Sequence, residues 1–487
     1  MLAAAAIQEG QVLLQVPESL FMTANTAVRS KLCGKLVKAA ELPEWQALVL
    51  HLLCERAAGP DSSWAPYIAV LGRQRHHPLL WSSELQGQLA GSPMMRLLTD
   101  RLQQVQQDTE QLVAAGANEL EVAQRWQQQT QTPLVDVGSV SWAAAVLLGR
   151  SFQLDMSEPE LPLGPDMSYY GSWQAHGPAV LALVPWADML RHSSEAGEAA
   201  MLAYDPEARA ALLAAHRPYA PGAEVFDSHG PSLSWADLVM DHGCVGEGSS
   251  DNPRYDALLF QHLQPRGSRN AALLEALTAL TGGPPALVLT PSGPDVTCMA
   301  ALRAGLASDA ELIKAGWRSG SKGSDVELCA RVMGRLSVPV SLATERRVLQ
   351  LLDKAVQTCS AAYPSSIECD RQELQQQLVQ QQQQQQAVGD AGSTGDNAAD
   401  SIAAEHMQVR IGVLRALISE KSALLDCAEA VAAWQAALEA LAAGAGSSIQ
   451  AQVSAKQLAA VYGSDGDDDS WTCHEPRNTT RAPCCGV

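Results

Sequence analysis

The sequence predicts an α+β protein, in which a first half that mixes strands with helices is followed by an all-helical second half. Two observations support this prediction. Short segments of alternating apolar and polar residues, bounded by Gly and Pro, occur in the first half at Glu9–Pro17 and Ala179–Val184, as expected of strands. After Asp251 the apolar residues return at the spacing of an amphipathic helix.

Length and charge limit the class of protein. The 487 residues suffice for about two to four domains. Lys and Arg total 33 against 53 Asp and Glu, a net charge of −20, which disfavours binding to nucleic acid or to an anionic membrane. The apolar runs are much shorter than the ~20 residues of a membrane-spanning helix. The N-terminal residues lack a basic or Arg- and Ser-rich pattern, so we expect no targeting segment in this chain.

The cysteines do not follow the spacing of a disulfide framework. All 11 are scattered along the chain, and without a secretory signal we expect them to be reduced thiols. Cys473, His474, Cys484 and Cys485 resemble a metal site in composition but lack two close pairs on stiff turns. We therefore predict no metal.

Helical spacing also dominates between the strands of the first half. It extends from Pro43 to about Asn118 and returns at Ser141–Arg150. Further along, Glu224–Phe226 is predicted as a strand and Ala236–Val245 as a segment that begins as a helix.

In the second half, helices are predicted over Asn270–Leu280, Met299–Leu312, Glu327–Leu336, Glu345–Cys359 and Ala403–Leu441. Before the last of these, Gln375–Gln386 is mostly glutamine and could extend a helix, whereas Ala387–Asp400 is expected to be a solvated loop. The predicted domains are residues 1–250 with a helical insert at about 43–140, then 251–445 with a low-complexity loop at 375–400, then a disordered tail at 446–487.

The conventional motifs of phosphate loops, zinc proteases and serine hydrolases are absent from the sequence. The informative stretch is Leu183–Ser193, which reads as a strand end, a proline turn and a short helical turn. It carries Asp188 and His192 four residues apart, a spacing that alone is more often a surface pair or a helix cap than a functional site. Ala220–Pro231 and Ser234–Val245 follow it along the chain.

The order of these stretches resembles the SET-domain methyltransferases of the Rubisco large-subunit lysine methyltransferase type. The family pattern is "P-x-x-D-x-x-N-H-S", then "G-E-E-V-x-x-x-Y-G", then "S-N-A-E-L-L-x-x-Y-G-F". The resemblance spans roughly 9–441 and implies a SET-domain β-fold with a helical insert, followed by an all-α substrate-binding domain. Further matching segments are Glu9–Pro17, Trp64–Tyr67 with Pro78–Trp81, Trp142–Phe152, Ser324–Glu327, Tyr363–Asp370 and Arg415–Lys421.

The resemblance implies transfer of a methyl group from S-adenosyl-L-methionine to a lysine of a protein substrate. The acceptor amine must be neutral, although a free lysine titrates near about 10.4, and a desolvated channel lowers that cost. A plastid acceptor is implied by resemblance alone, so chloroplast and cytoplasm both stay open as compartments. Carried over by position, the roles are Arg191 and His192 at the cofactor, Arg150 and Asp188 at the substrate, and His229 and His242 at the two catalytic tyrosines.

This sequence departs from the family pattern at the channel. Both tyrosines are imidazoles here, Arg191 replaces the Asn of the first motif, and Trp235 replaces the Asn of "S-N-A-E". The family's "G-x-G" segment would lie upstream of Glu9. It is missing here, because the sequence starts at Met1, downstream of where that segment would lie. We therefore expect weak methyl transfer or none.

Two hypotheses remain open. One is a divergent methyltransferase that acts on lysine, or on histidine as in one branch of the family. The other is a catalytically impaired SET-like protein that binds a protein partner. The acceptor protein and the oligomeric state cannot be read from the sequence.

Overall fold

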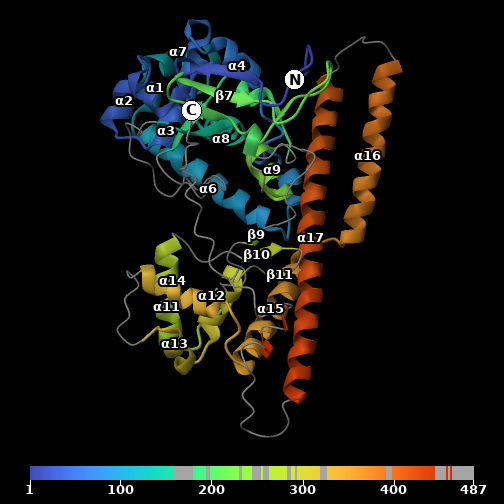
Figure 1. Ribbon diagram of the computed structural model, residues 1–487. Coiled ribbons are helices and arrows are strands. Elements are labelled where there is room, and N and C mark those ends of the chain that lie inside the picture. The colour runs from blue at the N-terminus through green and yellow to red at the C-terminus, as the bar shows by residue number, and fades with distance from the viewer. Residues whose placement is uncertain are drawn as a thin grey trace, which may run out of the picture. The chain divides into compact units, whose positions relative to one another are not determined.

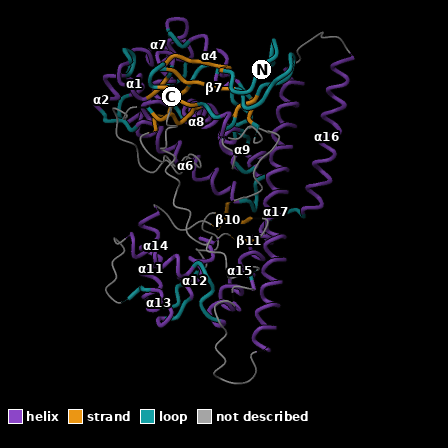
Figure 2. Tube along the Cα trace, in the orientation of Figure 1, coloured by secondary structure: helices purple, strands orange, loops and turns teal. Residues whose placement is uncertain are grey.

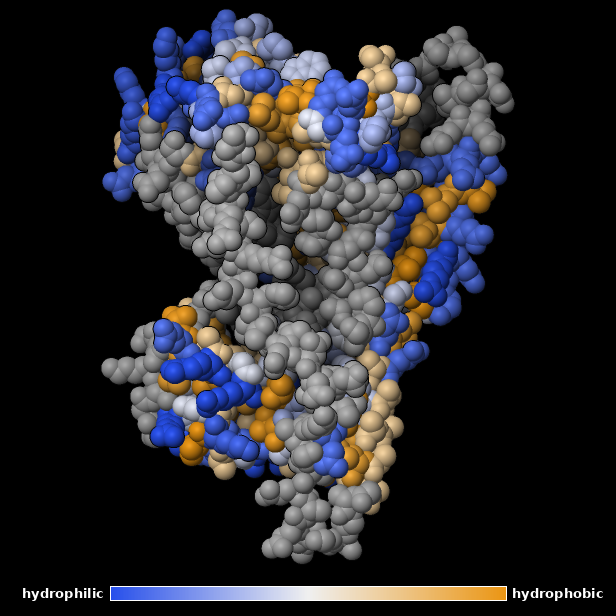
Figure 3. Space-filling model, in the orientation of Figure 1, coloured by the Kyte–Doolittle hydropathy of each residue, from blue (hydrophilic) through white to orange (hydrophobic). Residues whose placement is uncertain are grey.

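The computed structural model describes residues 1–156, 179–193, 198–229, 233–243, 254–255, 263–281, 287–290, 293–294, 296–318, 326–390, 398–444, 457–458 and 461–462. The chain divides into two compact units, Met1–Asp251 with Tyr363–Glu420, and Asn252–Ala362 with Lys421–Val487. Hydrophilic residues cover much of the described surface that faces the viewer in Figure 3. Within the described ranges, no helix combines the length and the hydrophobicity that crossing a bilayer requires.

The described residues of the first unit form three small sheets (Figure 2). β1 (Val12–Pro17) pairs antiparallel with β7 (Ala210–Ala214), which also pairs with β6 (Ala203–Asp205). β4 (Ala179–Leu183) lies between β2 (Met22–Thr23) and β3 (Ser151–Asp155). The third sheet is a parallel pair, β5 (Arg191–His192) with β8 (Phe226–Asp227).

The strands predicted from alternation are confirmed with small shifts. Glu9–Pro17 and Ala179–Val184 contain β1 and β4. The strand predicted at Glu224–Phe226 begins at Phe226, because Glu224 makes only an isolated bridge to Leu2. The shifts are small because the alternation marks which residues are buried, whereas the strand ends depend on partners elsewhere in the chain.

Helices surround these sheets. The helical spacing predicted for Pro43–Asn118 is confirmed, with breaks between the helices. The predicted helix Ser141–Arg150 is confirmed and begins one turn earlier, because Asp136 accepts a hydrogen bond from the backbone N–H of Ser139 at 2.7 Å and caps it. The elements are α1 (Ala24–Arg29), α2 (Gly34–Ala39), α3 (Glu44–Ala58), α4 (Ala65–Leu71), α5 (Ser83–Gly87), α6 (Pro93–Ala114), α7 (Glu121–Thr130) and α8 (Val137–Arg150).

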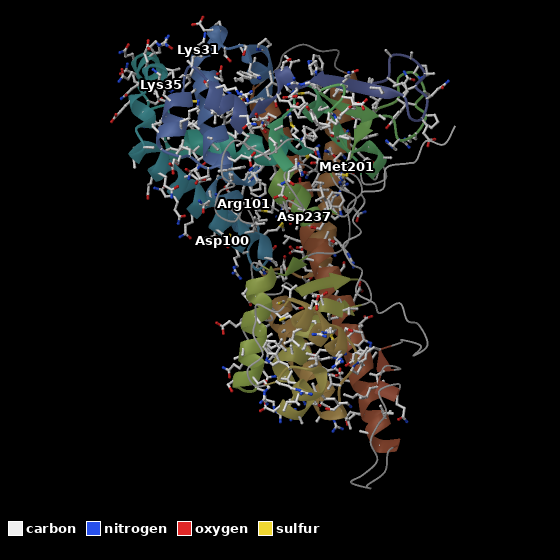
Figure 4. All side chains as sticks on the ribbon, turned by 60° about the vertical axis from the view of Figure 1, so that its left-hand side comes forward. Lys31, Lys35, Asp100, Arg101, Met201 and Asp237 are labelled. Carbon is white, nitrogen blue, oxygen red and sulfur yellow. The ribbon has the colours of Figure 1, made fainter. Side chains whose placement is uncertain are left out.

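Helix α9 (Trp235–His242) ends at the predicted site. A capping box starts it, in which Ser234 and Asp237 bond to each other's backbone N–H groups. The fully buried Arg101 of α6 holds its other end, donating to the carbonyl of Met240 and to the carboxylate of Asp241. Figure 4 shows Arg101 on α6 with Asp237 of α9 nearby.

The second unit is built on a helical core. Arg303, Trp317 and Glu345 are almost completely buried in it, and Arg303 forms an ion pair with Glu345 at 3.0 Å. The prediction of one helix over Met299–Leu312 is wrong, because Ser308 caps the start of a second helix. The helices are α11 (Ser268–Thr281), α12 (Val296–Leu306), α13 (Asp309–Ala315), α14 (Val326–Leu336) and α15 (Leu342–Ala362).

This helical half also contains a small sheet that the sequence analysis did not predict. β10 (Leu287–Thr290) pairs with both β9 (Arg254–Tyr255) and β11 (Gly293–Pro294). Two of its strands have two residues each, too short for a period of two to be visible in the sequence.

The low-complexity loop predicted at 375–400 is wrong over 375–390. The glutamine tract continues α16 (Ile367–Asp390), and α17 (Ala398–Gly444) begins at 398, while 391–397 lie outside the described residues. α16 and α17 run side by side (Figure 1), and Arg410 binds both carboxylate oxygens of Glu373 at 2.6 and 2.7 Å. Glutamine has a good helix propensity, so the tract can continue the helix that begins before it. Residues 363–420 make most of their contacts within the first unit. The domain limits predicted at 250 and 445 stay a prediction.

The disordered tail predicted at 446–487 is wrong at the four positions of the tail that the structure describes. Leu458 is buried against Leu349 and Leu438. Tyr462 donates a hydrogen bond to a carboxylate oxygen of Glu345 at 2.6 Å. The cluster at Cys473–Cys485 lies outside the described residues. The cysteines within them form no disulfide.

Candidate active site

The parallel pairing of β5 with β8 brings two of the sequence motifs together. Arg191 lies opposite Phe226, and His192 lies opposite Asp227. Beyond β8 the chain turns back on β5, because the backbone N–H of His229 donates to Nδ1 of His192 at 3.0 Å. The first two motifs of the resemblance therefore meet at their imidazoles.

Three imidazoles form a stack at this place. The rings of His192 and His229 have centroids 5.3 Å apart and planes 16° apart. The rings of His229 and His242 are closer and nearly parallel, at 4.2 Å and 8°. His229 thus lies between a residue of β5 and the last residue of α9.

Glycines let the third imidazole approach. Gly243 ends α9 with φ +57°, and a Cβ there would lie 2.8 Å from the His76 ring and 2.9 Å from its carbonyl oxygen. At Gly149 the backbones of α8 and α9 lie close, and His242 Nδ1 is 3.4 Å from the Gly149 carbonyl oxygen. A side chain at Gly243 would push α9 and its histidine out of the stack, whereas a Cβ at Gly149 would make only ordinary contacts, the nearest at 3.5 Å from the Asp241 carbonyl oxygen.

All six residues that the sequence analysis proposed for the site line one pocket of about 180 Å³. They come from the end of α8, the turn Ala187–Met189, β5, the segment after β8 and the end of α9. No single element could have shown that they meet. The lining residues are Gln74, His76, Gly149, Arg150, Asp188, Leu190, Arg191, His192, His229 and His242.

Asp188 is a buried acceptor at the centre of a small network. One of its oxygens, Oδ2, accepts from the Tyr67 hydroxyl at 2.9 Å and from Arg150 at 3.3 Å. Burial raises the pKa of this carboxyl, against the opposing effects of Arg150 and Tyr67. Its Oδ1 is buried without a hydrogen-bond partner among the described residues. Because Arg150 binds Asp188, the two predicted substrate residues act as one unit.

Arg191 differs from the other five in exposure. Its side chain is 61% exposed and pairs with Glu224 at 3.3 Å, at the surface end of the pocket. Such a pair contributes little to stability, about 0–1 kcal/mol. The guanidinium therefore remains available to an anionic group of a ligand.

Burial keeps the three stacked imidazoles neutral. It lowers the pKa of His192 to about 4 and that of His242 to about 4, and it lowers the pKa of His229 well below the usual 6.5. The hydrogen bonds then assign two tautomers. His192 Nδ1 accepts, so its Nε2 carries the proton, whereas His242 Nδ1 faces a carbonyl and is the donor.

The described residues offer donors and acceptors for an organic cofactor rather than ligands for a metal. No group of three or more His, Cys, Asp or Glu in that part of the chain could hold an ion. The lone pairs of stacked imidazoles lie in parallel planes and cannot converge on one point. The buried Nε2–H of His192 and Oδ1 of Asp188 have no partner there, and S-adenosyl-L-methionine carries groups that could bind both.

Sequence reasoning missed four residues of this region. Gln74 and His76 line the pocket, Tyr67 donates to Asp188, and the buried Asp227 lies beside His229. Tyr67 belongs to the matching segment Trp64–Tyr67, but the sequence analysis gave it no role at the site. Asp227 directly follows the predicted strand Glu224–Phe226, and a charged residue at the end of a partly buried strand was the signal that could have identified it.

The fold is that of a SET-domain protein with a helical second part. A solved structure described as the SET domain of LSMT bound to lysine and AdoHcy superposes with a TM-score of 0.63, at 17% identity, over 90% of this chain and 85% of that chain. A second structure, of Rubisco LSMT bound to AdoMet, gives 0.61 over 90% and 86%. At such identity the likeness establishes the fold, and the predicted fold class is confirmed.

Sequence comparisons agree with this class. Residues 270–424 match the family model described as Rubisco LSMT substrate-binding. The chain is 24% identical over 247 residues to SET domain-containing protein 4 of Homo sapiens, which covers 50% of this chain and 51% of that protein. It is 23% identical over 251 residues to the chloroplastic Rubisco large-subunit N-methyltransferase of Pisum sativum, covering 49% and 44%.

One relative methylates a different side chain. The actin-histidine N-methyltransferase of Mus musculus is 38% identical over 81 residues, which cover 16% of this chain and 13% of that protein. The chain thus spans about half the length of the first curated relatives that it matches, and much less of this one.

Proposed function

We propose that this protein is an S-adenosyl-L-methionine-dependent protein methyltransferase whose acceptor is a lysine amine of another protein. The observation that carries the proposal is the convergence of Arg150, Asp188, His192, His229 and His242 on one pocket. The homologous enzymes with lysine acceptors and the solved complexes of this fold with AdoMet support the same cofactor and acceptor class.

The neutral imidazoles supply what the chemistry requires of a channel. The cofactor, when bound, supplies a methyl group on a sulfonium. His192 can donate from Nε2 to an acceptor of the cofactor, and Arg191 can bind an anionic group at the open end. His242, protonated on Nδ1, presents an Nε2 lone pair that can accept a hydrogen bond from the acceptor amine and orient it for attack.

The imidazoles replace phenols with a different geometry. A ring nitrogen reaches less far than a phenol oxygen, and a neutral imidazole either donates or accepts at each nitrogen. This difference favours slow transfer, or an acceptor other than lysine. A histidine acceptor is the second candidate, supported by the similarity to the actin-histidine enzyme.

Cofactor binding tests the proposal directly. Isothermal titration of the full chain with S-adenosyl-L-methionine should show binding, and His192→Ala should weaken it about tenfold or more, since a buried donor is lost. The exposed His406→Ala on α17 is the matched control and should bind as the wild type does. Absence of binding by the wild type, or a His192→Ala variant that only lowers the melting temperature, would contradict the proposal.

Restoring the phenols tests the role of the imidazoles. We expect His242→Tyr to raise methyl transfer from labelled cofactor to protein extract. One preorganised polar group at a reacting centre is worth roughly 100- to 1000-fold. Faster transfer by the unmodified chain would show that the imidazoles perform the work of the phenols.

A further inference from the structure

A buried carboxyl group lies directly beside the imidazole stack. Asp227 is the last residue of β8 and is 2% exposed. Its Oδ2 lies 4.0 Å from Nδ1 of His229, and its Oδ1 has no hydrogen-bond partner among the described residues. The adjacent Ser228 hydroxyl is likewise buried without one. A polar group buried in this way costs stability, so its presence calls for a role outside packing.

The two ring nitrogens of His229 have different surroundings. Its Nδ1 is directed to Asp227, and the residue also lines the pocket. The distance of 4.0 Å is longer than a hydrogen bond, and a small shift of either side chain would let the carboxyl oxygen accept a proton from Nδ1. The neutral ring then carries its lone pair on Nε2, the nitrogen available to a molecule in the pocket. An Asp–His pair that holds an imidazole in the tautomer of a base is the logic of the hydrolase triads.

We propose that Asp227 and His229 together accept the proton that the acceptor amine must lose before methyl transfer; this inference rests on the proposed function. The N–H bond of the ammonium breaks and its proton passes to Nε2 of His229, while the Nδ1 proton of His229 passes to Oδ2 of Asp227. An ammonium and a carboxylate become a neutral amine and a carboxylic acid. Away from bulk water, removing two opposite charges is favourable.

Burial brings the pKa of the Asp227 carboxyl and the pKa of the acceptor ammonium closer together. Burial raises the pKa of Asp227 to about 7, and the carboxylate of Asp188 adds to this. Burial of an ammonium lowers its pKa from about 10.4. His229 serves as a relay rather than as the final acceptor, because burial lowers its own pKa. The other titratable groups around the site are Arg150, Asp188, Arg191, His192, His76, His242, Asp237 and Asp241.

The proposal is tested with Asp227→Asn in the full chain. For the wild type, kcat/KM should rise as pH increases through about 7, where Asp227 loses its proton. The variant should lose this limb of the profile and show a kcat at pH 8 at least tenfold lower, with little change in KM. Asp155→Asn, an exposed aspartate at the end of β3, is the matched control and should keep the wild-type profile. An unchanged profile in Asp227→Asn overturns the proposal.

A second measurement does not depend on turnover. In protein labelled with nitrogen-15 at histidine, the His229 ring, identified by its loss in His229→Gln, should report the Nδ1–H tautomer. It should also sense a titration near pH 7 that disappears in Asp227→Asn. The opposite tautomer, or a titration that survives in the variant, overturns the relay. Failure of the wild type to bind S-adenosyl-L-methionine would instead overturn the proposed function.

Discussion

Acidification is expected to destabilise the first unit steeply between about pH 6.5 and pH 4. Burial lowers the pKa of His76, His77, His192, His229 and His242 in the folded protein. Below pH 6.5 the histidines of the unfolded chain bind protons, whereas the buried histidines of the folded chain stay neutral. The stability that these residues contribute is therefore complete above that pH and is lost as pH falls. For His192 and His242, the change from 6.5 to about 4 corresponds to at most about 3 kcal/mol each.

Three carboxyls oppose this trend. Burial raises the pKa of Asp227, Asp188 and Glu44, so the stability that they contribute is lost as pH rises through their folded values, to about 7 for Asp227. Five imidazoles against three carboxyls leave acid as the destabilising direction. Urea unfolding at pH 7.5 and pH 5 should therefore give a lower midpoint at pH 5.

Variants separate the contribution of the stack from general acid sensitivity. The change in midpoint between the two pH values should shrink in the double variant His192→Gln, His242→Gln. It should stay as in the wild type in the exposed His406→Gln. Comparing how much the urea midpoint changes between the two pH values, rather than the midpoint itself, cancels the packing cost of the substitutions. An equal change in midpoint in all three proteins would show that these imidazoles become protonated in the folded protein.

Replacing Arg101 by Met is expected to cost about 3–5 kcal/mol of unfolding free energy, because it removes the cation from a buried ion pair. Arg101 is fully buried, and the Asp241 side chain is 4% exposed. Arg101 also donates to the carbonyl of Met240, so the last turn of α9 loses two hydrogen bonds. His242 is the last residue of this turn, so disturbing the turn should impair the site as well as stability.

Two controls make the measurement specific. Arg125→Met removes an exposed ion pair with Glu121, whose side chains are 56% and 87% exposed, and should cost less than about 1 kcal/mol. The double variant Arg101→Met, Asp241→Leu should recover part of the loss, since no buried charge is then left without its cation. Urea unfolding of each protein gives the values. A loss below 1 kcal/mol for Arg101→Met would show that the pair is not buried in solution.

Local sequence patterns predicted the elements whose own residues determine them. The alternation in Glu9–Pro17 and the apolar run before Arg150 predicted β1 and α8, because burial of one face repeats with the period of the element. The strands β9 and β11 escaped this reasoning, since a two-residue strand exists only through its partner β10. The glutamine tract was ambiguous because glutamine suits both a helix and a solvated segment, and the structure places it in α16.

The sequence by itself determined which residues belong to the candidate site: the motif order located Arg150, Asp188, Arg191, His192, His229 and His242, and all six line one pocket. The tertiary structure alone decided how these side chains are arranged. Ring stacking, the hydrogen bond from His229 to His192 and the contact of His229 with Asp227 join segments far apart along the chain. Burial sets their protonation, and burial is a property of the surrounding packing that no stretch of sequence contains.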